Sequence, residues 1–128
     1  MNTKEKGDIA VGQAIAYFIK KGCEVCLPIG DKRHFDLIIE KDNVLDRVQV
    51  KYAGKYTKGR NKNKCRVALR ITGGNQSFNY ARKYSDKDFD SIFVYTEKGE
   101  CYHIPWKLID CRNELSIECY KYKKFKVI

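Results

Sequence analysis

A chain of 128 residues has the length of one ordinary domain, and 43% apolar with 33% charged residues argues against both disorder and a membrane protein. Because its first residues, Met-Asn-Thr-Lys-Glu-Lys, contain no apolar signal segment, we expect a single cytoplasmic domain over residues 1–128 and six reduced cysteines. The net charge of +10 indicates a polyanionic partner and no affinity for a bilayer interior.

The predicted elements begin with a helix and three strands. Apolar residues at helical spacing (Val11, Ile15, Phe18, Ile19) predict an amphipathic helix over residues 7–21, which Gly22 ends. Alternating or β-branched runs predict strands over residues 23–28, 35–40, 45–52, 65–72, 90–96 and 101–104. Residues 75–84 are expected to form a loop or a short helix, residues 105–109 a helical turn, and residues 119–128 an edge strand. This order predicts an α/β or α+β sheet flanked by helices.

The second and third predicted strands form a hairpin. A turn centred on Asp42 and Asn43 makes paired residue numbers sum to 85, so Asp36 lies opposite Gln49 with β-carbons about 5 Å apart. Lys51 projects from the same face, two residues further along. The other face collects five apolar side chains that are expected to point into the core. They are Phe35, Leu37, Ile39, Val48 and Val50.

An acid, an amide and an amine on one face suit metal-assisted chemistry. The Asp36 carboxylate, the Gln49 amide oxygen and a neighbouring backbone carbonyl are hard ligands of the kind that Mg²⁺ binds. The Lys51 amine can orient a water molecule or stabilise developing charge. Asp8 lies three residues before Val11, so we expect it on the helix face that meets the sheet, where a metal would compensate its charge.

Asp36, followed after twelve residues by Gln49-Val50-Lys51, resembles the PD-(D/E)XK nuclease superfamily in its Asp…(Glu/Gln)-x-Lys form. The resemblance covers residues 6–52 and is strongest to small single-domain members: intron-encoded homing endonucleases and, more distantly, archaeal-type Holliday junction resolvases. Two positions depart from the family pattern. Phe35 precedes Asp36 where Pro is usual, and Gln49 replaces the usual Glu, which removes one charge from the metal site.

The resemblance implies a restriction-endonuclease-like αβββαβ core, with a mixed central sheet flanked by helices, and hydrolysis of double-stranded DNA that depends on Mg²⁺ or Mn²⁺. It implies that Asp36, Gln49, the Val50 carbonyl and Asp8 hold the metal. Lys51 would assist the attacking water. Because one small domain holds one active site, cutting both strands further predicts a homodimer or homotetramer.

The basic residues gather in one block. From Arg47 to Ser85 there are eleven Lys or Arg residues and no Asp or Glu, which favours DNA as the partner. A flexible basic loop over residues 54–64 is expected to bind phosphates through Lys55, Lys58, Arg60, Lys62 and Lys64. Base contacts are expected from Gln76, Asn79 and Arg82. Aromatic residues in the same block are expected to stack on bases, namely Tyr52, Tyr56, Phe78, Tyr80 and Tyr84.

Other interpretations remain open. The alternative enzyme is a Holliday junction resolvase, and the alternative outside enzymes is a non-catalytic nucleic-acid-binding protein. Cys23 and Cys26 have a zinc-like spacing but no second pair, so buried thiols are favoured over a zinc site. His34 is expected at a solvated loop end, and His103 is expected to be structural.

Overall fold

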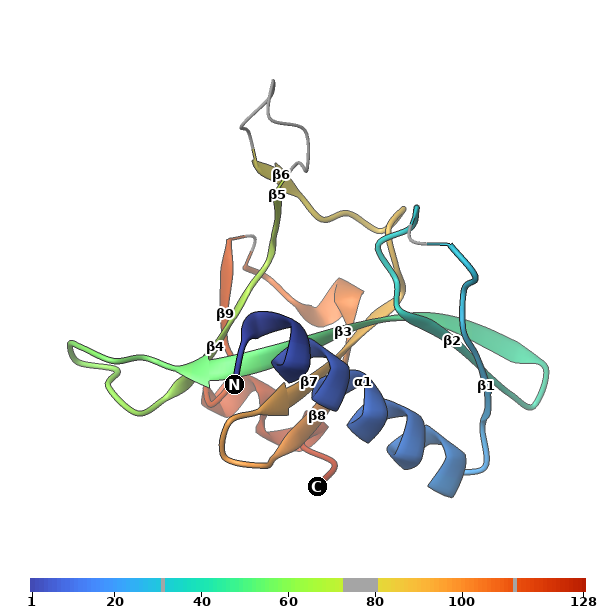
Figure 1. The fold of residues 1–128 in the computed structure, drawn as a ribbon, viewed down its shortest axis with the longest axis horizontal. Helices are drawn as coiled ribbons and strands as arrows, with labels where there is room; N and C mark the ends of the chain where they lie inside the picture. Colours follow the sequence, from blue (N-terminus) through green and yellow to red (C-terminus); the bar gives the residue numbers. More distant parts are fainter. Residues whose placement is uncertain (31, 73–80, 112) are drawn as a thin grey trace.

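One long helix lies across a seven-stranded mixed sheet, and a smaller two-stranded hairpin projects away from it (Figure 1). This computed structural model describes residues 1–128 except 31, 73–80 and 112. The sheet has the order β1-β2-β3-β4-β9, with β7 paired to both β3 and β8. It is mixed, as predicted, because β7 runs parallel to β3 whereas the other paired strands are antiparallel.

The helix α1 covers Thr3–Lys20. The sheet consists of β1 (Glu24–Cys26), β2 (Leu37–Lys41), β3 (Val44–Lys55), β4 (Cys65–Ala68), β7 (Ser91–Thr96), β8 (Cys101–Pro105) and β9 (Glu114–Ser116). The projecting hairpin consists of β5 (Arg70–Thr72) and β6 (Ala81–Lys83). Two 3₁₀ helices, η1 (Trp106–Leu108) and η2 (Tyr120–Phe125), follow β8 and β9. Within the described residues, no helix is long and apolar enough to cross a membrane.

Helix α1 begins earlier than its apolar pattern predicts because Asn2 caps it, accepting a hydrogen bond from the Glu5 N–H at 2.8 Å. Its buried stripe consists of Ala10, Ala14 and Phe18. The expected stripe is therefore displaced around the helix, and Ile19 is 58% exposed. Two alanines on the buried stripe let the helix backbone lie close to the sheet.

Two apolar layers cover the two faces of the sheet. Under α1, the buried residues include Phe18, Leu37, Val48, Val50 and Phe93. The opposite layer is formed by strand residues together with the C-terminal segments, which contribute the side chains of Trp106, Ile109, Leu115, Ile117 and Tyr122. The face of β3 that α1 does not cover is thus the one where alternate residues Gln49 and Lys51 lie.

Two expectations about secondary structure are wrong, one about the helices beside the sheet and one about the C-terminal tail. In the part of the chain that the structure describes, α1 is the one α-helix, so the sheet is not flanked by helices on both sides and the second helix of the αβββαβ order is not seen. The tail forms η2 rather than an edge strand. Its packed residues Cys119, Tyr122 and Phe125 recur every third position, which is the period of a 3₁₀ helix and not that of a strand.

Candidate active site

The hairpin of β2 and β3 has the register that the sequence predicts. Lys41 pairs with Val44, so the numbers of paired residues sum to 85. Asp42 and Asn43 form the turn with φ angles of 53° and 68°. Both residues adopt the left-handed conformation that a two-residue hairpin turn requires, and Asp and Asn tolerate it better than most residues. Turn chemistry therefore sets which residues of the two strands face each other.

Asp36 is attached to β3 through its backbone and its side chain. Its N–H donates to the Val48 carbonyl at 2.8 Å, which continues the register and sets Asp36 opposite Gln49. Its Oδ2 atom accepts a hydrogen bond from the Val50 N–H at 2.8 Å. Burial raises the pKa of the Asp36 carboxyl, and the Val50 N–H and the Lys51 charge oppose that rise. The oxygen Oδ2 is thus fixed, while Oδ1 accepts no hydrogen bond from the described residues.

Gln49 carries an unsatisfied buried oxygen. Its Oε1 atom is buried and has no hydrogen-bond partner within the described part of the chain. Leaving a buried acceptor unpaired costs about 1–3 kcal/mol, so folded proteins normally supply a partner. Because Gln49 faces Asp36 across the hairpin, a hard cation held by both side chains would satisfy this oxygen.

Lys51 lies against an aromatic ring for which the sequence predicts another role. Its ammonium is 5.0 Å from the ring centroid of Tyr84, within the range of a cation–π interaction. Tyr84 is only 8% exposed, and its ring meets those of Phe89 and Trp106 edge to face, with centroids 4.9 and 6.4 Å away. The expectation that Tyr84 stacks on bases is therefore wrong, since its ring is enclosed by protein. It supports the predicted catalytic lysine instead.

The core-facing side of the hairpin agrees with the prediction except at one position. Leu37, Ile39, Val48 and Val50 are all buried in the layer beneath α1. Phe35 lies before β2 begins, outside the regular alternation, and packs against the layer on the other side of the sheet.

Asp8 does not lie where the helix pattern places it. It is exposed, whereas the buried stripe of α1 runs through Ala10, Ala14 and Phe18. Helix α1 also covers the Val48 and Val50 face of β3, which is opposite to the face of the other three predicted residues. The expectation that Asp8 points into the sheet is therefore wrong, and its predicted role as a metal ligand stays a prediction.

The predicted flexible loop over residues 54–64 is an ordered arm. It continues the β3–β4 hairpin outward through hydrogen bonds between backbone groups, including Tyr56 N–H to the Lys64 carbonyl at 2.9 Å. Figure 1 shows this arm projecting from the end of β3. Lys55 forms an ion pair with Glu97 at 3.6 Å, so its charge is compensated. Three cations of the arm are exposed, and their side chains have no partner among the described residues: Lys58, Arg60 and Lys62. Lys64 is also exposed, but its charge helps to lower the pKa of Glu118.

The structure describes only some of the aromatic and polar residues from which base contacts are expected. Tyr56 donates to the Glu114 carboxylate and Tyr52 packs beside Tyr95, so both are partly enclosed by protein rather than open for base stacking. Gln76, Asn79, Phe78 and Tyr80 lie outside the described residues. For Arg82 the structure describes the backbone alone, in β6.

The donor set fits a weakly held, hard divalent cation. Among the described residues, no group of three or more His, Cys, Asp or Glu side chains could hold a metal. The hairpin instead brings together one carboxylate, Asp36, and one orphaned amide oxygen, that of Gln49. Mg²⁺ is commonly held by one or two protein carboxylates with water and substrate phosphate oxygens completing its octahedron. These two side chains therefore fit such an ion, and they suit it better than a zinc ion, which prefers sulfur and nitrogen.

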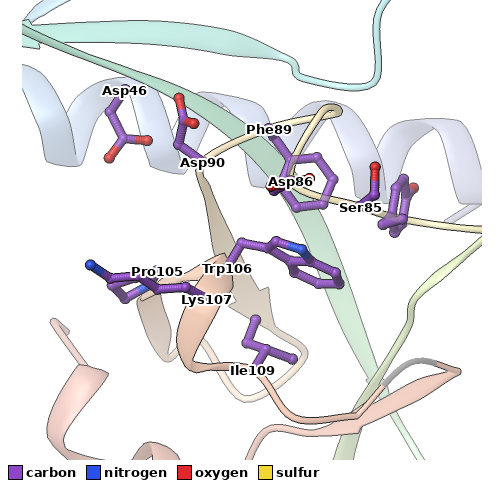
Figure 2. Close-up of a pocket in the computed structure, with 10 residues that line it drawn as sticks. Asp46, Ser85, Asp86, Phe89, Asp90, Pro105, Trp106, Lys107 and Ile109 are labelled. Carbon is purple, nitrogen blue, oxygen red and sulfur yellow. The ribbon is translucent and has the colours of Figure 1, made fainter.

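A cavity of about 810 Å³ lies near the trio without including it. Figure 2 shows Trp106 and Phe89 within it, with the carboxylates of Asp46 and Asp90 close together at one side. Because acidic side chains line this cavity, it is poorly suited to DNA phosphates. The groups suited to hydrolysis therefore lie on the hairpin and not in this cavity.

Comparison with known proteins gives a family match and a structural match over nearly the whole chain. The family described as PD-(D/E)XK endonuclease matches residues 1–124. The solved structure of a bacterial homing endonuclease, I-Ssp6803I, is similar with a TM-score of 0.82 and 26% sequence identity, covering 98% of this chain and 89% of that chain. None of the curated proteins compared with the chain matches it.

Proposed function

The chain belongs to the PD-(D/E)XK endonuclease family, and from this premise we propose that it cuts double-stranded DNA with the help of a divalent metal ion. The observation that carries the proposal is the orphaned Oε1 of Gln49, which faces Asp36 across the hairpin. A buried acceptor beside a carboxylate with a free oxygen is a place that a cation would fill.

The proposed roles follow from the contacts of the hairpin. Asp36, Gln49 and the Val50 carbonyl would hold Mg²⁺, or Mn²⁺ in its place, which lowers the pKa of a bound water and neutralises charge on the scissile phosphate. The Val50 N–H already orients the Asp36 carboxylate, so this side chain needs little rearrangement to bind. The Lys51 ammonium would orient the attacking water or balance the charge that develops on the phosphate.

Asp8 is the fourth residue of the proposed site, and it is exposed on α1. We propose that it contributes to metal binding when substrate is present. Asp8→Asn should then raise the Mg²⁺ concentration needed for half-maximal cleavage. If the Mg²⁺ titration of Asp8→Asn matches that of the parent, Asp8 is not part of the site.

We also propose that the enzyme works as a homodimer or homotetramer, because one domain with one active site cuts one strand at a time. Three large apolar side chains of the C-terminal half are exposed and available for such an interface: Leu108, Tyr120 and Ile128. Light scattering at working concentrations, with and without DNA, should report two or four copies. A monomer under both conditions contradicts this proposal.

The test of the function uses three substrates, each incubated with Mg²⁺ or with EDTA: supercoiled plasmid, linear duplex and a four-way junction. We expect both double-stranded substrates to be cut in Mg²⁺ and neither in EDTA. Cleavage of the junction alone would favour a resolvase, and cleavage in EDTA would contradict metal dependence. Asp36→Ala, purified in the same way, controls for contaminating nucleases and should cut nothing.

A further inference from the structure

A second cavity, of about 520 Å³, opens beside the catalytic hairpin between the segment that precedes β2 and the turn that precedes β7. Its lining is dominated by basic side chains, with Lys32 and Arg33 on one wall and Arg47 and Lys87 on the other. This cavity includes none of the residues of the arm, and its composition is opposite in sign to that of the acidic cavity in Figure 2.

Arg47 makes one wall rigid. Its guanidinium donates to both carboxylate oxygens of Asp90, at 3.1 and 3.0 Å, and to the carbonyls of Lys87 and Asp86, at 3.0 and 3.1 Å. Its backbone N–H donates to Asp90 as well, at 2.9 Å. Most of its donors are therefore used inside the protein, so Arg47 shapes the cavity and its charge is offset by Asp90.

The free positive charge comes from three other residues. Lys32, Arg33 and Lys87 are exposed, and their charged side-chain groups have no partner among the residues that the structure describes. One carboxylate, that of Asp88, also lines the cavity, and its Oδ2 atom accepts from the Ser85 N–H at 2.8 Å. Three uncompensated cations against one hydrogen-bonded carboxylate leave the cavity positive, which suits a phosphate.

The position of the cavity relates it to the catalytic trio. Arg47 precedes Gln49 by two residues on the same face of β3, which is a separation of about 7 Å along a strand. Successive phosphates of one DNA strand are about 3.4 Å apart along the helix axis. The cavity also reaches the trio through His34, whose ring centroid lies 6.1 Å from that of Tyr84, the ring under Lys51.

We propose that this cavity binds a backbone phosphate of the DNA strand that is cut, one or two nucleotides from the scissile bond. Lys32, Arg33 and Lys87 supply the charge, and Arg47 holds the wall on which the phosphate rests. The site would fix the register of the substrate strand against Asp36 and Lys51. The inference rests on the proposed function, because it names where the substrate of that reaction is held.

The first measurement is the salt dependence of binding to a duplex in EDTA, where no cleavage is expected. One phosphate contact contributes about −0.9 to the slope of log affinity against log salt. Replacing Lys32, Arg33 and Lys87 together with Ala should therefore flatten the slope by about 0.9, so that the loss of affinity between about 50 and about 200 mM salt shrinks by about 3.5-fold. The control is Lys20→Ala, an exposed cation on α1, which covers the opposite face of the sheet; its slope should equal that of the parent.

The second measurement locates the phosphate. Once the parental cut is mapped, single phosphates on either side of it are replaced with neutral methylphosphonates. One of these replacements, one or two nucleotides from the cut, should slow the parent but not slow the triple variant further. Circular dichroism and thermal unfolding of the variant should match the parent, because the three side chains are exposed.

The outcomes separate this inference from the proposed function. A triple variant with the parental slope and the parental response to every methylphosphonate overturns the phosphate site, while cleavage by the parent still supports the function. A parent that binds duplex but cuts nothing in Mg²⁺ overturns the function, and the slope then decides whether the cavity holds a phosphate. A parent that binds no duplex overturns both.

Discussion

The Oδ2 atom of Asp36 accepts a hydrogen bond from the backbone N–H of Val50 at 2.8 Å, so a predicted metal ligand is oriented by the strand that carries its partners. Asp36→Asn keeps an oxygen for this N–H but removes the charge. We expect cleavage to fall by about a thousandfold or more, because charge stabilisation by a bound metal is worth several kcal/mol. Single-turnover cleavage with saturating enzyme measures this loss.

The affinity of Asp36→Asn for DNA should not fall along with its cleavage rate. Removing a carboxylate from beside a phosphate removes repulsion when no metal is present, so binding of Asp36→Asn in EDTA should equal or exceed that of the parent. Asp36→Ala leaves the Val50 N–H without its acceptor and should in addition lower the free energy of unfolding by about 1–3 kcal/mol. Parental cleavage rates in both variants would refute the assignment of Asp36.

Gln49 offers a test in which stability and activity change in opposite directions. Gln49→Met has similar volume and no buried acceptor, so it should raise the free energy of unfolding of the metal-free protein by about 1–3 kcal/mol, the cost of the orphaned Oε1. It should also abolish Mg²⁺-dependent cleavage. Gln49→Glu should stay at least partly active and need less Mg²⁺, because a carboxylate is the stronger ligand. Urea denaturation and Mg²⁺ titration of cleavage measure the two effects; an inactive, destabilised Gln49→Met would point to a packing role alone.

Tyr84 is expected to position Lys51. A cation–π interaction is worth about 0.5–2 kcal/mol, so Tyr84→Leu should lower the single-turnover rate roughly 2- to 30-fold while DNA affinity stays unchanged. Tyr84→Phe retains the ring and should cleave at nearly the parental rate. Because leucine cannot pack against Phe89 and Trp106 as the tyrosine ring does, the folded fraction of the Leu variant is measured first by thermal unfolding. Equal rates for the Leu and Phe variants, both folded, would remove Tyr84 from the mechanism.

The parts of the site that sequence alone predicts are those fixed by local rules. The Asp42-Asn43 turn sets the register of the hairpin, so the pairing of Asp36 with Gln49 can be derived from a few neighbouring residues. The helical spacing of apolar residues defines the buried face of α1 less closely. The same apolar pattern allows the buried stripe to shift around the helix, and Asp8 is consequently misplaced.

Interactions between residues distant in sequence were not predictable in this way. The Tyr84 ring reaches Lys51 because the turn before β7 folds back over β3, where Asp90 binds Arg47. The run of positive charge correctly indicates a polyanionic partner, but it does not distinguish a free cation from a compensated one. Lys55 is paired with Glu97, whose position in sequence gives no hint of the ion pair.

Charge variants of the arm test whether it holds DNA phosphates. Neutralising six phosphates implies a slope of about −5 for log affinity against log salt on duplex DNA. Replacing the free cations Lys58, Arg60 and Lys62 with Ala should flatten this slope by about 0.9 for each phosphate that the arm no longer neutralises. Lys55→Ala is the control, since its charge is already offset by Glu97, and it should change the slope less than a single substitution of Lys58, Arg60 or Lys62. An unchanged slope in the triple variant would show that the arm does not hold phosphates.

His103 is expected to make stability depend on pH. The Ser91 hydroxyl donates to Asp46 Oδ1 at 2.7 Å, so its oxygen accepts from His103 Nε2 at 2.9 Å, an arrangement that places a proton on Nε2. Burial, together with the charge of Lys21, lowers the pKa of His103 from 6.5 to about 4. The unfolded chain therefore binds a proton below pH 6.5 that the folded protein does not accept until about pH 4.

The contribution of His103 to stability is accordingly complete above pH 6.5 and is lost as the pH falls toward 4, by about 3 kcal/mol in all. His103→Gln keeps an N–H donor for Ser91 and does not titrate. Its free energy of unfolding, measured with urea at several pH values, should fall less than that of the parent across this interval. Groups remote from His103 that titrate in this interval are present in both proteins, so their effects cancel in the difference. Parallel curves for parent and variant would mean that His103 is already accessible to protons in the folded state.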